Sequence, residues 1–135
     1  MNNAKNLAKG DAAILKVQSK DNTINSILSE VVDFYSLKYG SQLIQVWLYG
    51  SKARGDYGNS SDMDITVVVG ENTPINRGLD IDLDKYDMAM SVLARYDELI
   101  SVMTYTIDDF NSDAISLHRN VKKEGVLYYD KYRQR

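Results

Sequence analysis

The hydrophobic pattern of the first half of the chain changes period once. Apolar residues recur every three or four positions up to Tyr39, which predicts a helix that begins between residues 21 and 23 and buries one face. Two short apolar runs follow, over residues 42–49 and 62–69. Both are rich in β-branched and aromatic residues, and they predict two strands joined by a polar loop.

The second half of the chain alternates the same two patterns. In chain order they predict a helix over residues 80–95, a strand over 98–105, a helix over 113–123 and a short extended segment over 126–129. The order α, β, loop, β, α, β, α predicts an α/β (α+β) fold, in which a small mixed sheet carries helices packed on one face.

The helix predicted over residues 80–95 has an apolar stripe that an aspartate interrupts. The stripe predicts a buried face made of Leu83, Tyr86, Asp87, Met90, Leu93 and Ala94. The methionines Met88, Met90 and Met103 are expected to fill the core. His118, the only histidine, is expected to be a half-exposed structural residue and not a catalytic one.

Composition predicts one soluble domain with two short extensions. The 135 residues are 44% hydrophobic and 26% charged, which is ordinary for a globular protein. We divide them into a polar N-terminal arm (1–22), a single domain (23–130) and a basic tail (131–135). No apolar run is long enough to span a membrane and no secretion signal is recognisable, so we expect a cytoplasmic protein with no membrane partner.

Charge and cysteine content exclude several functions. The formal net charge of −3 argues against general nucleic-acid binding, which normally needs a basic face. The absence of cysteine excludes disulfides, thiolate metal sites and cysteine nucleophiles.

The candidate chemistry lies where the second predicted strand begins. Asp62 and Asp64 are two residues apart, so in a strand their carboxylates project from the same face. The two carboxylates repel each other unless a cation lies between them, and hard oxygen ligands of this kind suit Mg²⁺. Upstream, the turn Gly50-Ser51 offers backbone N–H groups and a hydroxyl to a phosphate, and Arg54 offers a guanidinium. The pattern predicts a site for a metal-bound nucleoside triphosphate.

Taken together, these motifs resemble one enzyme superfamily. Gly50-Ser51, Ala53-Arg54-Gly55, Ser60-Ser61 and Asp62-x-Asp64 stand in the order and spacing of the DNA polymerase β-like nucleotidyltransferases. The short chain is most similar to the minimal nucleotidyltransferases of the MntA-like antitoxin type, and residues 120–128 look like the end of such domains.

The resemblance implies a reaction and a partner. It implies that Gly50, Ser51 and Arg54 bind the phosphates of a nucleoside triphosphate, with ATP expected, and that Asp62 and Asp64 are catalytic and hold Mg²⁺. A nucleoside monophosphate would pass to a hydroxyl group as pyrophosphate leaves. Proteins of this type often pair with a helical HEPN-type protein, and some are antitoxins that adenylylate it.

One position departs from the family pattern. The third carboxylate of the family lies on the next strand, and here the matching position falls near Ser101. Asp97 and Glu98, at the entrance of that strand, are the alternatives. The sequence therefore leaves two readings open: an active nucleotidyltransferase, or a nucleotide- and partner-binding module in which transfer is slow or absent.

Overall fold

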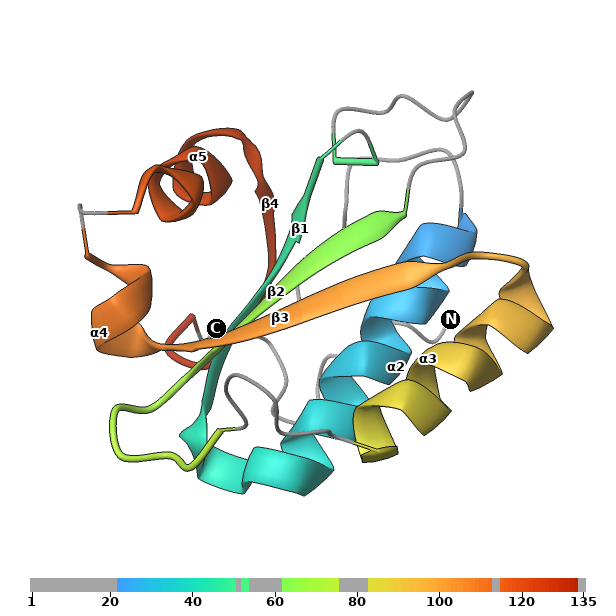
Figure 1. Ribbon diagram of the computed structural model, residues 1–135, viewed down its shortest axis with the longest axis horizontal. Helices are drawn as coiled ribbons and strands as arrows, with labels where there is room; N and C mark the ends of the chain where they lie inside the picture. Colours follow the sequence, from blue (N-terminus) through green and yellow to red (C-terminus); the bar gives the residue numbers. More distant parts are fainter. Residues whose placement is uncertain (1–21, 51, 54–61, 76–82, 113–114, 134–135) are drawn as a thin grey trace.

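A four-stranded mixed sheet forms the centre of the protein (Figure 1). The computed structural model describes residues 22–50, 52–53, 62–75, 83–112 and 115–133. The strands are β1 (Leu43–Tyr49), β2 (Met63–Val69), β3 (Ile100–Thr106) and β4 (Val126–Asp130), in the spatial order β3-β2-β1-β4. Only β2 and β3 are parallel, whereas β1 is antiparallel to both of its neighbours. The predicted α/β fold with a small mixed sheet is confirmed.

The three longer helices of the described residues agree in number and order with the helices that the sequence predicted. They are α2 (Asn22–Tyr39), a 3-10 turn η1 (Gly40–Gln42), α3 (Leu83–Tyr96), a short α4 (Ile107–Phe110) and α5 (Ser116–Glu124). Among the described residues, no helix is both long and apolar enough to cross a membrane. Residues 126–129, predicted only as an extended segment, lie within β4. This strand pairs with β1 and forms one edge of the sheet.

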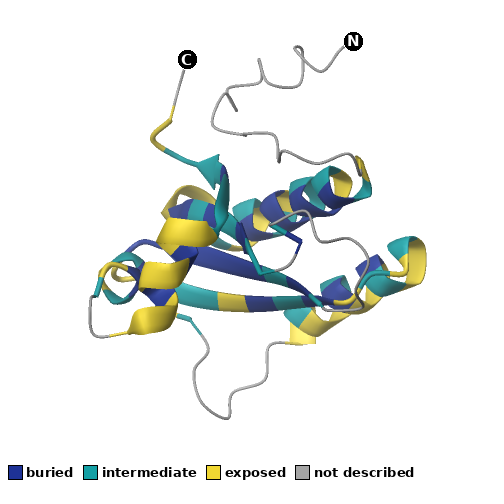
Figure 2. Ribbon diagram, turned by 90° about the horizontal axis from the view of Figure 1, so that it is seen from above, coloured by how far each residue is buried: buried dark blue, intermediate teal, exposed yellow. Residues whose placement is uncertain are grey.

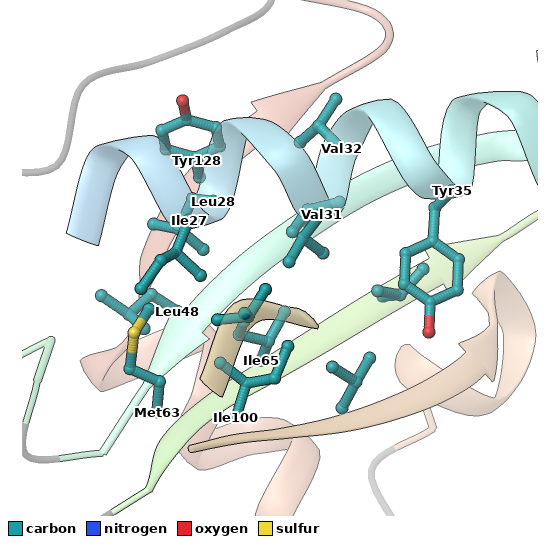
Figure 3. Close-up of a cluster of buried hydrophobic side chains, with 14 of the residues drawn as sticks. Ile27, Leu28, Val31, Val32, Tyr35, Leu48, Met63, Ile65, Ile100 and Tyr128 are labelled. Carbon is teal, nitrogen blue, oxygen red and sulfur yellow. The ribbon is translucent and has the colours of Figure 1, made fainter. Parts of the chain in front are cut away.

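The main core lies between α2 and the sheet (Figure 3). Six residues of α2 are buried at the predicted helical spacing: Ile24, Ile27, Leu28, Val31, Val32 and Tyr35. They contact strand residues such as Leu48, Ile65 and Ile100. Each fully buried aliphatic side chain contributes about 2 kcal/mol through the hydrophobic effect, so α2 is held mainly by this face.

A second, smaller core shows that helices lie on both faces of the sheet. Ile44 and Val68 point away from α2 and pack with Phe110 of α4 and Val121 of α5, and Figure 1 shows these two helices on the side of the sheet opposite α2 and α3. The expectation of helices on one face therefore holds for the two long helices only. The short helices are too brief for periodicity to reveal which face they cover.

His118 belongs to this second core and is buried, not half-exposed as predicted. Its Nδ1 lies 2.8 Å from the carbonyl oxygen of Asp109, so Nδ1–H donates to that oxygen. Its ring also contacts the edge of Tyr105. The histidine is structural, as the sequence indicated, and fastens α5 to α4.

The buried face of α3 differs from the predicted one. The buried residues are Ala89 and Val92, whereas Leu83, Tyr86 and Met90 are exposed. Figure 2 shows how burial varies along the helices and strands. The helix carries two apolar stripes, and periodicity could not tell which one meets the core. The smaller stripe packs inward because α3 lies close to both α2 and the sheet. Met103 of β3, also expected in the core, is likewise exposed.

A polar cluster fixes α3 to α2. Arg95 donates two hydrogen bonds to the carboxylate of Glu30, at 2.8 and 2.6 Å, and the hydroxyl of Tyr96 donates a third at 2.6 Å. The hydrogen bonds from Arg95 and then from Tyr96 lower the pKa of Glu30 to about 2. Because both helices pack on the same sheet face, this cluster sets their relative position.

Candidate nucleotide and metal site

The candidate site lies where β1 ends and β2 begins. Tyr49 and Asp64 are direct partners in the antiparallel pair, so Gly50 follows β1 right beside Asp64. Gly50 has a φ of 85°, and a Cβ atom added there would lie 2.7 Å from Oδ2 of Asp64. Both the backbone conformation and the contact require glycine. Asp64 therefore approaches the main chain of the turn as closely as the absence of a side chain allows.

The two aspartates are held next to each other as the sequence predicted. Asp62 directly precedes β2 and Asp64 is its second residue, and both are half-buried. Burial raises the pKa of the Asp64 carboxyl, and the neighbouring charge of Asp62 raises it further. The carboxylates thus interact electrostatically, as expected for side chains on the same face of a strand.

The donors present fit a divalent cation. Two aspartate carboxylates supply hard oxygen ligands, and Mg²⁺ in proteins is commonly bound by one or two carboxylates together with substrate phosphates. The absence of a side chain at position 50 lets Oδ2 of Asp64 lie against the turn, where a Cβ atom would come within 2.7 Å of it. Within the described residues, no group of three or more acidic or histidine side chains comes together. The pair therefore lacks a third such ligand in this part of the chain.

The strand next to β2 carries a serine directly opposite Asp64. In the parallel pair of β2 and β3, Asp64 lies opposite Ser101, and the main-chain N–H of Met63 donates to the carbonyl of Leu99 at 2.9 Å. The strand predicted over residues 98–105 is present as β3. Position 101, near which the family resemblance led us to expect a third carboxylate, therefore carries a hydroxyl group next to Asp64.

Glu98, one of the two alternatives for that carboxylate, is engaged elsewhere. Its Oε2 lies 3.4 Å from Nζ of Lys52, and the side chains are 20% and 8% exposed, respectively. Asp97, the other alternative, is exposed and has a φ of 55° in the turn before β3. Neither carboxylate joins the pair of Asp62 and Asp64 into a group of three.

The ion pair of Lys52 and Glu98 was not foreseen from the sequence. Lys52 lies in the turn after β1, where the N–H of Ala53 donates to the carbonyl of Gly50 at 3.1 Å. The two residues meet because β3 runs parallel to β2, and no local pattern signals such a contact. In this structure the charge of Lys52 is paired with that of Glu98.

Two of the predicted phosphate-binding residues, Ser51 and Arg54, lie outside the described residues, as do Gly55, Ser60 and Ser61. The structure therefore brings together Gly50, Asp62 and Asp64 from the predicted set.

A cavity of about 280 Å³ opens beside Asp62. Its walls come from α3 and β3, and they include Ser101, Tyr86 and Met90. The carboxylate of the candidate site therefore borders a space large enough for a side chain of another molecule.

The sequence and the fold match known proteins. Residues 22–134 match the family described as Polymerase beta, Nucleotidyltransferase. A relative from Methanocaldococcus jannaschii, named "Putative protein adenylyltransferase MJ0604", is 34% identical over 104 residues, which cover 76% of this chain and 94% of the relative.

Two solved structures share the fold at low sequence identity. A toxin–antitoxin crystal structure with AMP-PNP has a TM-score of 0.51 at 16% identity, covering 76% of this chain and 72% of that one. A mutant of the MntA–HpeT toxin–antitoxin complex has a TM-score of 0.50 at 13% identity, covering 76% and 71%.

Proposed function

Since the chain belongs to the polymerase beta nucleotidyltransferase family, we propose that it transfers a nucleoside monophosphate from a Mg²⁺-bound nucleoside triphosphate to a hydroxyl group of a partner protein. ATP is the proposed triphosphate, so the product is an adenylylated protein. The observation that carries the proposal is the approach of Asp64 to the side-chain-free Gly50, beside Asp62. That arrangement places a glycine turn beside a pair of hard oxygen ligands.

Each residue of the proposed site has a role that suits its chemistry. Asp62 and Asp64 hold the metal through their carboxylates, and Gly50 gives the phosphates access to the main chain of the turn. Ser51 and Arg54 are proposed to bind phosphate through a hydroxyl and a guanidinium. When bound, Mg²⁺ neutralises charge on the phosphates and on the leaving pyrophosphate.

The proposed acceptor is a protein, since the curated relative is named a protein adenylyltransferase. Two proteins of this fold were solved as toxin–antitoxin complexes, one of them with AMP-PNP. We accordingly propose a helical HEPN-type partner that supplies the hydroxyl, with residues 23–130 acting as one domain and the reaction taking place in the cytoplasm.

A second function is favoured by one observation, the serine opposite Asp64. Without a third carboxylate, the chain would bind Mg²⁺ and nucleotide and dock to its partner but transfer slowly or not at all. This reading keeps the same two aspartates and the same turn.

The experiment that separates the two functions measures transfer and binding together. The protein is incubated with Mg²⁺ and each labelled nucleoside triphosphate, with and without the product of a neighbouring reading frame. Label transfer that Asp62→Ala and Asp64→Ala each abolish supports the enzyme. Asp33→Ala, an exposed change on α2, is the matched control and should transfer normally. Binding without transfer to the partner supports the second function, and absence of Mg²⁺-dependent nucleotide binding contradicts both.

A further inference from the structure

One ion pair joins the two strands that flank β2. Lys52 follows β1 and Glu98 precedes β3, and β2 lies between these strands in the sheet. β1 ends on the side of the sheet where β2 and β3 begin (Figure 1). Nζ of Lys52 and Oε2 of Glu98 lie 3.4 Å apart. The ion pair therefore lies at the end of the sheet that carries Asp62 and Asp64.

The Lys52 end of this pair belongs to the turn that begins at Gly50. The N–H of Ala53 donates to the carbonyl of Gly50 at 3.1 Å, so Lys52 is the third residue of a four-residue turn. Ala53 packs against the main core. Gly50 lies against Asp64, where a Cβ atom would come within 2.7 Å of Oδ2. Because the turn is so short, a displacement of Lys52 would also move its first residue relative to Asp64.

The Glu98 end of the pair is held by the sheet. The carbonyl of the next residue, Leu99, accepts a hydrogen bond from the N–H of Met63 at 2.9 Å. Met63 lies between the two aspartates of the candidate site in sequence, and from there β3 continues parallel to β2. Glu98 is thus a fixed point beside the candidate metal ligands, to which the turn is attached through Lys52.

The two partners differ in how strongly they depend on the pair. The side chain of Lys52 is 8% exposed and that of Glu98 is 20% exposed. A buried ammonium group without a partner is strongly unfavourable, whereas a carboxylate with access to water can be solvated. Loss of the Glu98 charge should therefore drive the long Lys52 side chain towards solvent and displace the turn. Loss of the Lys52 charge should leave the turn in place.

We propose that Glu98 is a positioning residue for nucleotide binding: by compensating the charge of the buried Lys52, it keeps the turn at Gly50 against Asp64. The inference rests on the proposed function, in which this turn binds the phosphates. It gives Glu98 a role other than that of a third metal-binding carboxylate. It also gives Lys52 a role other than that of a phosphate ligand, since each of the two charges is engaged by the other.

The test measures nucleotide affinity in the full-length protein, with Mg²⁺ and a fluorescent ATP analogue. The variants are Glu98→Gln, Lys52→Met and the double variant that combines them. The matched control is Glu30→Gln, which removes the carboxylate of a different ion pair, the one with Arg95 that joins α2 and α3. Melting curves are recorded for every variant, and each titration is carried out at a temperature at which that variant is folded.

Glu98→Gln should weaken nucleotide binding by about tenfold, the loss expected if the turn occupies its binding position about one-tenth of the time. Lys52→Met and the double variant should bind within about threefold of the wild type, because neither contains an unpaired buried ammonium group. Glu30→Gln should bind nucleotide like the wild type although it is less stable. In the transfer assay, Glu98→Gln should raise KM for the nucleotide by about tenfold and leave kcat within about twofold of the wild type.

A second variant covers the case in which Glu98→Gln does not fold. Glu98→Asp keeps the charge but moves the carboxylate away from Nζ of Lys52 by one methylene group. It should weaken nucleotide binding, and the addition of Lys52→Met should restore it. Normal binding by Glu98→Asp in that case would contradict the inference.

Each alternative role predicts a different result, and any of the three would overturn the inference. If Glu98 is a third carboxylate, kcat falls and the double variant does not recover. If Lys52 binds phosphate directly, Lys52→Met alone weakens nucleotide binding as strongly as Glu98→Gln. If the pair serves stability only, Glu98→Gln binds nucleotide normally. Failure of the wild type to bind nucleotide with Mg²⁺ would contradict the proposed function as well.

Discussion

Replacement of Gly50 by alanine tests the geometry of the site most directly, because a matched control exists in the same chain. Gly50 and Gly40 both have positive φ, 85° and 57°. A Cβ atom at Gly50 would lie 2.7 Å from Oδ2 of Asp64, whereas one at Gly40 would meet nothing within 4 Å. The two substitutions therefore share the backbone strain and differ in the contact with the carboxylate.

The magnitudes follow from these two terms. Alanine in the left-handed region costs about 1–2 kcal/mol, so Gly40→Ala should lower the melting temperature by about 4 °C. Gly50→Ala should cost that amount and about 1 kcal/mol more, since the Asp64 side chain must leave its rotamer. Mutation of a residue that keeps a metal ligand in position typically lowers the metal affinity of the site by about 10–100-fold. We therefore expect a loss of that size in Mg²⁺-nucleotide binding for Gly50→Ala only.

The assay is a titration of a fluorescent ATP analogue in the presence of Mg²⁺, with thermal denaturation of each variant in parallel. Gly40→Ala should be less stable but bind nucleotide like the wild type. If Gly50→Ala also binds like the wild type, the proximity of the turn to Asp64 has no functional meaning, and the reasoning from the glycine contact is wrong.

Three further outcomes are expected. Ser101→Asp should raise the rate of label transfer at least about tenfold if the third carboxylate is what the site lacks, and an unchanged rate would contradict that reading. Glu98→Gln should destabilise the fold by about 2 kcal/mol in chemical denaturation because it leaves Lys52 charged and nearly buried, and adding Lys52→Met should recover part of the loss. The folded-state pKa of Glu30 lies below its unfolded value, so its stabilisation is present above pH 4.5 and lost as pH falls toward about 2. Glu30→Gln should therefore lower the free energy of unfolding by about 1 kcal/mol at neutral pH, a value reduced because solvent screens the bonds to Arg95. It should also weaken the fall in stability between pH 4.5 and about pH 2. An unchanged fall in that pH range would show that the cluster contributes nothing.

The sequence predicted those features that depend on local pattern. The helical stripe of α2, the strands β1 and β2, and the adjacency of Asp62 and Asp64 all follow from periods of 3.6 or two residues. The third strand was also predicted from its apolar run, whereas its parallel pairing with β2, which sets Ser101 beside Asp64, was not.

The features that the sequence did not predict depend on tertiary packing. α3 has two apolar stripes, and its packing against α2 and the sheet decides that the smaller one, with Ala89 and Val92, faces inward. The burial of His118 requires α5 to lie on the second face of the sheet, and the pair of Lys52 and Glu98 requires parallel pairing of strands that are separated by a helix. Periodicity carries no information on any of these contacts.

The difference between local pattern and tertiary packing also separates two parts of the candidate site. The proposed nucleotide side is built from one turn and one strand start, where Gly50 and Asp64 are neighbours through an antiparallel pair. Such a site depends on few residues, and a short motif is enough to recognise it. The cavity beside Asp62 depends instead on α3 turning Tyr86 and Met90 outward, next to the edge strand β3. The same packing that made the prediction of the α3 face wrong therefore leaves these two side chains exposed. A change in that packing would alter the cavity while leaving the nucleotide motif intact, so similarity of the motif alone does not describe this side of the site.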